Sequence, residues 1–284
     1  MISPTLLAVP VFALIIGIEA FVSRLKKSNY YEKKDAWTNI GLGFGSLFFD
    51  AGFAAVFGLV YVFLYEISPL KMPTNVWWTW AIVLVADDFL FYWLHRVNHE
   101  SRFFWNFHVV HHSSGKFNLS TAVRQPWFGG TVAWIFYLPL ALLGFPLWMR
   151  VAAHGINLIY QFLIHTQYVK KLGFLEYIFN TPSHHRVHHG ANNEYLDKNY
   201  GGIFIIWDRL FGTFAEEKTE VNFGLIKPLQ SFNMLWINTH GWAEMWEAMK
   251  LRKTFSGKLR CIFGSPYMNF EEKILVSNDN KQNI

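Results

Sequence analysis

Five stretches of the chain are apolar over lengths close to that needed to cross a bilayer. They cover residues 5–22, 40–65, 76–94, 126–145 and 147–168. A transmembrane helix needs about 20 mainly apolar residues. Charged side chains make up only 16% of the 284 residues and hydrophobic ones 52%, whereas a soluble domain is about a quarter charged. The sequence therefore predicts an all-α membrane bundle of four to five segments, the last two forming a hairpin that does not cross fully.

Basic residues beside these stretches predict the orientation. The first loop holds five of them: Arg24, Lys26, Lys27, Lys33 and Lys34. Loop 66–75 holds only Lys71. Because basic loops stay in the cytoplasm, we expect the N-terminus outside, the third stretch emerging into the cytoplasm at His95, and the hairpin returning there near Lys170. The net charge of +5 fits an anionic membrane face better than nucleic acid, since no nucleic-acid-binding module is visible.

Nine of the twelve histidines fall into three short clusters. The clusters are His95 and His99; His108, His111 and His112; and His184, His185, His188 and His189. Residues three or four apart share one face of a helix, so each cluster presents several imidazoles in one direction. A tetrahedral site takes four ligands, and this larger supply indicates two metal ions. The single cysteine, Cys261, excludes a disulfide framework and cysteine-based clusters, so histidine, carboxylate and water must hold the metals.

Acidic side chains accompany the first cluster. Asp88, Tyr92, His95 and His99 follow the spacing 4, 3, 4, which is one helical face. A metal-bound histidine gives its other N–H to a carboxylate or a carbonyl, and we expect Asp88 to accept such a bond. Asp87 is expected to pair with a nearby arginine. Glu100 could bridge metals, accept a proton, bind a cationic cofactor or be a solvated glutamate.

The remaining histidines are sorted by their surroundings. Thr181 and Pro182 form a strong helix start, after which His185, His188 and His189 share one face. His184 lies on the flank of that face, and its role as a ligand stays open. His165 ends a polar stripe of the fifth stretch and is expected to reach the metals. A cytoplasmic helical cap is expected to carry the histidine-rich di-metal site. Three further assignments are non-catalytic: His154 packs between helices or lines a cavity, His240 lies on the surface, and Trp105 and Phe107 pack the cap.

Several long motifs resemble the fatty acid hydroxylase superfamily, which includes the sterol desaturases. They are residues 95–100 (HRVNHE), 108–114 (HVVHHSS), 117–125 (FNLSTAVRQ), 180–190 (NTPSHHRVHHG) and 197–214 (DKNYGGIFIIWDRLFGTF). Within the superfamily, the alkylglycerol monooxygenase branch fits best. The chain is shorter than the animal enzymes of that branch and lacks much of their C-terminal hydrophobic extension.

This resemblance implies a non-haem di-iron oxygenase that uses O2 to hydroxylate or desaturate a lipid. Carried over residue by residue, it implies nine metal ligands: His95, His99, His108, His111, His112, His165, His185, His188 and His189. Relatives often carry a further histidine where Gln161 stands, and the alkylglycerol branch has a functional glutamate where Glu100 stands. The implied partners are a lipid, O2 and an electron donor, which is a reductase, ferredoxin, b-type cytochrome or reduced pterin. Tetrahydropterin is the additional cofactor of that branch.

Three regions follow from these patterns. Residues 1–94 are predicted to be N-terminal transmembrane helices. Residues 95–214 are the histidine-rich catalytic region, with the hairpin 126–168 inside it, and residues 215–284 are a cytoplasmic segment with a disordered tail from residue 277. Rival functions are a sterol or fatty-acyl desaturase with a separate electron donor, a bis-histidine haem protein, a metal-binding transport protein and a zinc lipid hydrolase.

Overall fold

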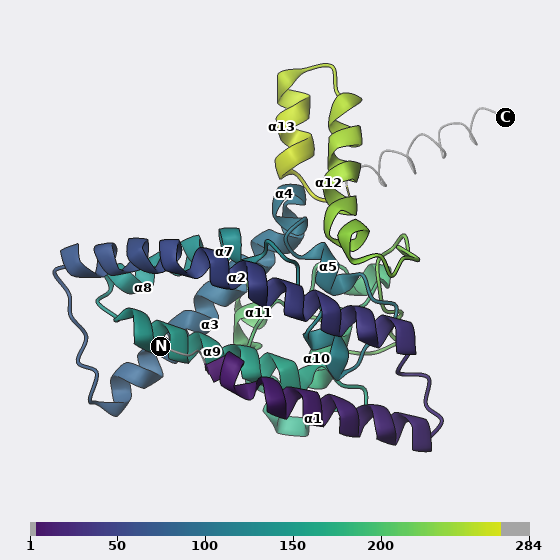
Figure 1. The fold of residues 1–284 in the computed structure, drawn as a ribbon, viewed down its shortest axis with the longest axis horizontal. Helices are drawn as coiled ribbons and strands as arrows, with labels where there is room; N and C mark the ends of the chain where they lie inside the picture. The colour runs from purple at the N-terminus through teal and green to yellow at the C-terminus, as the bar shows by residue number, and fades with distance from the viewer. Residues whose placement is uncertain (1–3, 268–284) are drawn as a thin grey trace.

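The computed structural model describes residues 4–267, and the regular secondary structure in this part of the chain is helical apart from two isolated bridge pairs. Four long helices form its body: α1 (Pro4–Leu25), α2 (Lys33–Ile67), α3 (Trp77–Glu100) and α9 (Leu147–Ile164). Figure 1 shows α1 and α2 extending along the long axis of the molecule, with α3 and α9 beside them. The all-helical prediction is therefore confirmed for the described residues, and the predicted tail from residue 277 lies outside them.

Helices α1 and α2 are long and apolar enough to cross a membrane. At 1.5 Å per residue the 35 residues of α2 extend about 50 Å, which exceeds the hydrocarbon core of a bilayer. Their outer faces leave large apolar side chains uncovered, among them Phe21 at 62%, Phe48 at 75% and Leu59 at 72% exposure. Exposed apolar surface of this extent marks contact with a partner or a membrane.

Two packing layers connect these helices to the rest of the chain. Tyr61 of α2 and Val83 of α3 pack with Leu140 and Met149. Phe12 of α1 stacks on Phe162 of α9, with ring centroids 3.9 Å apart. Because α3 contacts α9 along much of its length, the C-terminal ends of both helices lie beside the same cap.

The predicted fourth segment, 126–145, is not one long helix. It divides into α7 (Gly130–Phe136) and α8 (Leu138–Leu142). Pro139 lies in the first turn of α8, where its ring and its missing N–H interrupt a continuous helix. Only α9 of the expected hairpin is therefore a continuous long helix.

Short helices build the cap at one end of α3 and α9. They are α4 (Arg102–Trp105), α5 (Val109–His112), α6 (Leu119–Ala122), the 3-10 helix Gly173–Tyr177, α10 (Pro182–His188), the 3-10 helix Asn193–Tyr195 and α11 (Ile206–Phe211). Two further helices, α12 (Met234–Lys250) and α13 (Phe255–Phe263), project from the body as a pair (Figure 1). Ile237 of α12 packs with Leu42 of α2 and Val110 of α5, which fixes the base of this pair to the cap.

Candidate metal centre

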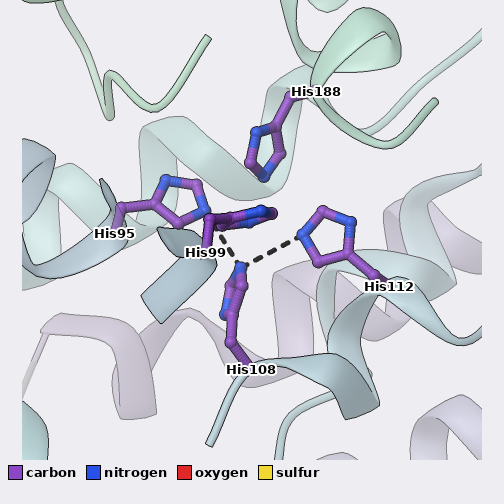
Figure 2. A group of neighbouring side chains, drawn as sticks. All are labelled: His95, His99, His108, His112 and His188. Carbon is purple, nitrogen blue, oxygen red and sulfur yellow. Dashed lines mark hydrogen bonds between the residues drawn. The ribbon is translucent and has the colours of Figure 1, made fainter. Parts of the chain in front are cut away.

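Nine histidines gather in the cap as two groups. The five-histidine group consists of His95, His99, His108, His112 and His188. The four-histidine group consists of His111, His165, His185 and His189. Within each group the candidate ligand nitrogens lie within 4.8 Å of one another. Figure 2 shows the rings of the five-histidine group converging from different helices on one point. The structure thus brings together all nine histidines that the sequence predicts as ligands.

The division into two groups follows from helix geometry. Successive residues of a helix point about 100° apart, so neighbouring histidines are directed to different groups. His111 and His112 on α5 divide in this way, as do His188 and His189 at the end of α10. The groups adjoin where the His112 and His189 rings stack, with centroids 4.3 Å apart and planes 20° from parallel. Two bound ions would therefore be close neighbours.

Local sequence signals place these helices. The 4, 3, 4 spacing on α3 keeps His95 and His99 on its buried side, each 4% exposed. Helix α10 begins as the sequence predicts, with Thr181 as its N-cap and Pro182 at its first position. His165 is the C-cap of α9, so this long helix ends at the four-histidine group.

Backbone carbonyls orient four of the rings. The Nδ1–H groups donate in the pairs His95 to Tyr200 (2.8 Å), His111 to Arg124 (3.1 Å), His165 to Gln161 (2.6 Å) and His188 to Lys198 (3.0 Å). A carbonyl can only accept, so Nδ1 carries the hydrogen and Nε2 presents a lone pair to the centre of the group. Burial keeps such rings neutral: it lowers the pKa of His111 to about 4 and that of His188 well below its ordinary value. Neutral imidazole is the form that binds metal.

Some inward nitrogens face only one another and others have no hydrogen-bond partner. Nε2 of His108 lies 3.0 Å from Nε2 of His95 and 3.1 Å from Nε2 of His112 (Figure 2). Nε2 of His99, His188 and His189 is buried without a hydrogen bond, and Nε2 of His185 faces Nε2 of His165 at 2.9 Å. Nε2 of His111 faces Nε2 of His165 at 3.2 Å, although the carbonyl bonds give both atoms lone pairs. Two ligands about 2.1 Å from one ion and at right angles would lie about 3 Å apart. The donor set therefore fits a cation in each group, and all of its donors are imidazoles, which suit iron, copper or zinc.

Asp88 does not accept a hydrogen bond from a histidine, which corrects the prediction. Its buried carboxylate accepts from the backbone N–H groups of Ile203 (2.6 Å) and Phe204 (3.0 Å). The Trp207 indole and the Asn157 amide also donate to it, at 2.9 and 3.0 Å. Asp88 thus holds the loop 200–204, whose Tyr200 carbonyl accepts from His95.

The other predicted acids also have unexpected partners. Asp87 contacts His154 and Asn157 rather than an arginine. Glu100 pairs with Arg96 at 2.9 Å, its side chain is 43% exposed, and it belongs to neither histidine group. This position does not support a metal-bridging role for Glu100.

Four further residues lie outside the two histidine groups. His184 joins neither group, and its Nδ1 accepts from the Thr181 backbone N–H. His154 lies against Tyr137, as a packing residue would. His240, predicted on the surface, is only 3% exposed because α12 packs against the cap. Trp105, predicted only to pack, lies 4.9 Å from the His99 ring and 5.4 Å from the His112 ring.

Sequence reasoning did not assign a role to Arg124, Tyr200 or Asp197. Arg124 is fully buried, donates to the Val110 carbonyl, and offers its own carbonyl to His111. Tyr200 is fully buried beside the His99 ring, and its hydroxyl has no partner. Asp197 has φ of 57°, a left-handed conformation that is uncommon for a residue other than glycine. The available signal was their membership of the long motifs at 117–125 and 197–214.

A cavity of about 1230 Å3 opens onto one of the two groups. His99, His112 and His188 line it, whereas no member of the four-histidine group does. Trp105 and Asp197 also line it from the cap, and Trp236 lines it from α12. We call it the cap cavity. Of the two groups, only the five-histidine group borders the cap cavity, so an ion held there is the one a substrate would approach through it.

Comparison with known proteins agrees with this arrangement. The fatty acid hydroxylase family model matches residues 80–213, a range that contains all nine histidines. The chain is 40% identical to alkylglycerol monooxygenase of Homo sapiens over 262 residues, which cover 91% of this chain and 58% of the relative. For the Danio rerio enzyme the identity is 41% over 261 residues, with the same coverage of 91% and 58%. Ornithine lipid hydroxylase OlsE of Rhizobium tropici is 36% identical over 133 residues, 46% of this chain and 40% of the relative. The chain thus spans little more than half the length of the alkylglycerol monooxygenases, and no solved structure matches it significantly.

Proposed function

Residues 80–213 belong to the fatty acid hydroxylase family, and from this premise we propose that the protein is a membrane-bound non-haem di-iron oxygenase that hydroxylates a lipid. The observation that carries the proposal is the pair of adjoining all-histidine groups, one of which borders a cavity. The names of two relatives, alkylglycerol monooxygenase and ornithine lipid hydroxylase, support a lipid as the substrate class.

Each group has a distinct task in this proposal. His95, His99, His108, His112 and His188 would hold the ion nearest the substrate, and the four-histidine group would hold the second ion. Bound iron would supply the redox chemistry that activates O2 for attack on a C–H bond. The haem alternative is disfavoured because the nine rings pack against one another, whereas a bis-histidine haem needs two opposed rings with a macrocycle between them.

The chain's own residues orient the ligands and shield them from water. Carbonyls of Tyr200, Lys198 and Arg124 fix the ring tautomers before any metal binds. Trp105 covers the edges of His99 and His112 on the cavity side. The cap cavity combines such apolar surface with the Asp197 carboxylate, so a lipid with a polar head and an apolar chain would find both kinds of wall.

We infer that the two groups face the cytoplasm, with the N-terminus outside. The basic loop between α1 and α2 supports this orientation, as do the uncovered apolar faces of these helices. In this arrangement α3 and α9 also enter the bilayer and end at the cap. The native thiol of Cys261 is buried, so single cysteines introduced at Lys27 and Lys71 would report sidedness. A membrane-impermeant thiol reagent applied to intact cells should label the second position and spare the first.

The reaction is tested with purified protein in lipid nanodiscs. Samples loaded with Fe(II) or Zn(II) are supplied with an ether lipid, an acyl lipid or a sterol under 18O2, and products are analysed by mass spectrometry. We expect 18O in a lipid product only with iron and a reductant. Equal turnover with zinc and without O2 would identify a hydrolase instead, while desaturation of an acyl chain or sterol would identify the alternative within the family.

The same assay distinguishes the electron donors. Reduced tetrahydropterin, ferredoxin and a b-type cytochrome with its reductase are supplied in turn. Glu100 lies at the exposed end of α3, one helical turn beyond Arg96, so we place it on the donor side of the site. Glu100→Gln should then slow reduction by the true donor while leaving the iron content unchanged.

A further inference from the structure

A chain of hydrogen bonds ends on a tyrosine close to the five-histidine group. The Thr213 hydroxyl donates to the Asp208 carboxylate at 2.7 Å. Its oxygen can therefore accept, and the Tyr92 hydroxyl lies 3.0 Å from it. Arg96 donates to the Tyr92 oxygen at 3.2 Å. Tyr92 thus donates its only proton to Thr213, and Thr213 donates its own proton to Asp208.

Asp208 is well suited to take up a proton. It is fully buried and also accepts from the backbone N–H groups of Tyr200 (2.7 Å) and Gly201 (2.8 Å). Burial raises the pKa of Asp208 to about 6. Its carboxylate is therefore ionised at neutral pH, yet it binds a proton more readily than an exposed aspartate does.

Aromatic rings connect Tyr92 in two directions. Towards the metal centre, the Tyr200 ring lies 6.1 Å from Tyr92 and 5.3 Å from the His99 ring. Towards the protein surface, the Trp93 ring lies 5.5 Å from the Tyr92 ring and is half-buried, and the Arg96 guanidinium lies over its face. Tyr200 has no acceptor for its hydroxyl proton, so of these two tyrosines only Tyr92 can lose an electron and a proton together.

We propose that Tyr92 is a redox-active residue that passes single electrons to the five-histidine group, while Thr213 and Asp208 hold its proton. The oxidant is the iron centre of the proposed function after it has reacted with O2. One electron leaves Tyr92 for that centre, the phenol proton moves to Thr213, and the Thr213 proton moves to Asp208. A one-electron donor at the surface then reduces the tyrosyl radical, and the proton returns along the same path. In the absence of substrate, the relay removes an oxidising equivalent from the centre before it damages a ligand.

This proposal rests on the proposed function, and the test uses two oxidants so that failure of one can be told apart from failure of the other. In the first arm, metal-free full-length protein in nanodiscs is oxidised by a photogenerated ruthenium(III) complex. In the second arm, iron-loaded protein without substrate is mixed with O2. Both are freeze-quenched, and the radical is identified by electron paramagnetic resonance with ring-deuterated tyrosine. We expect a tyrosyl radical in both arms, with slower formation in D2O.

Matched variants assign the radical. Tyr92→Phe should abolish the signal, whereas Tyr195→Phe, which alters a buried tyrosine whose hydroxyl contacts Thr219 rather than Thr213, should keep it. Thr213→Val removes the proton path at almost constant volume and should suppress the signal, and Thr213→Ser should restore it. The Thr213 pair remains informative even if Tyr92→Phe does not fold.

The outcomes distinguish failure of the relay from failure of the proposed function. An unchanged radical in Tyr92→Phe would overturn the relay, as would equal yields in the valine and serine variants at Thr213. Absence of a Tyr92 radical from both arms in protein that still hydroxylates lipid refutes the relay alone. A Tyr92 radical in the ruthenium arm, with no reaction of the iron protein with O2, supports the proton-coupled tyrosine and refutes the proposed oxygenase instead.

Discussion

Replacing Asp88 by asparagine should remove metal from one histidine group and spare the other. The Asp88 carboxylate accepts four hydrogen bonds, two of them from the backbone of Ile203 and Phe204. This segment continues directly from Tyr200, whose carbonyl orients His95. The four-histidine group is oriented by other carbonyls. Its members His111 and His165 donate to the carbonyls of Arg124 and Gln161, which lie outside this loop.

The magnitude follows from counting donors. An asparagine oxygen can accept about two of the four bonds, and its amide group would face the remaining donors. A buried donor left unpaired costs about 1–3 kcal/mol, so Asp88→Asn should lower the free energy of unfolding by about 2–6 kcal/mol in total. Loss of the support behind a ligand typically weakens metal binding by about 10–100-fold, and here that loss falls on His95.

Graded chelation measures the effect. Purified variants are dialysed against increasing chelator, and iron per chain is determined by elemental analysis. Wild-type protein should lose its ions at high chelator, whereas Asp88→Asn should lose one ion early and retain the other. Asp87→Asn is the matched control, because Asp87 is equally buried but contacts His154 and Asn157 rather than the loop. Parallel loss of both ions from Asp88→Asn, or the same loss from the Asp87 control, would refute this reasoning.

Three other predictions concern the ligands and their supports. His111→Ala should abolish turnover and lower bound iron, whereas His184→Gln should leave the iron content unchanged, because His184 belongs to neither group; elemental analysis and product assays test both. Metal-free protein should lose stability as pH falls below 6.5, because burial lowers the pKa of His188 and that of His111, the latter from 6.5 to about 4 in the folded chain, so the unfolded chain binds more protons. Their stabilisation is complete above pH 6.5, and thermal unfolding that is flat between pH 7 and 4 would contradict this. Arg124→Met leaves the buried Asp35 carboxylate without its cation and should cost about 3–5 kcal/mol, part of which Asp35→Asn should restore in a chemical denaturation experiment.

The candidate ligands could be predicted from sequence because their signal is local. Spacings of three and four residues put imidazoles on one helix face, and the Thr181–Pro182 start of α10 was readable from residue type alone. Helix geometry turns His111 and His112 in different directions, but the histidines that each of them joins could not be predicted, since these depend on how α5 and α10 approach each other. Which histidines share an ion is therefore a property of packing.

The hydrogen-bond partners of Asp88 could not be predicted from the sequence either, because they also depend on packing. Asp88 lies seven residues before His95 on the same helical face, which favoured a direct contact in the sequence. Its actual partners lie 115 and 116 residues further along the chain, in the loop 200–204. His240 is buried although its sequence surroundings predict a surface residue, because its burial depends on α12 packing against the cap. In each case a contact between distant segments overrides a local pattern.

The acids around this site support its ligands rather than joining them. Asp88 holds Ile203 and Phe204, while Asp208 holds the backbone of Tyr200. Neither histidine group contains a carboxylate, so bound divalent ions would meet only neutral donors and keep most of their positive charge. The carboxylates of Asp88 and Asp208, which lie behind the ligands, offset part of that positive charge without occupying a coordination position. Substitutions at these acids should therefore alter metal affinity and redox behaviour through the ring orientations, and the identity of the ligands should remain the same.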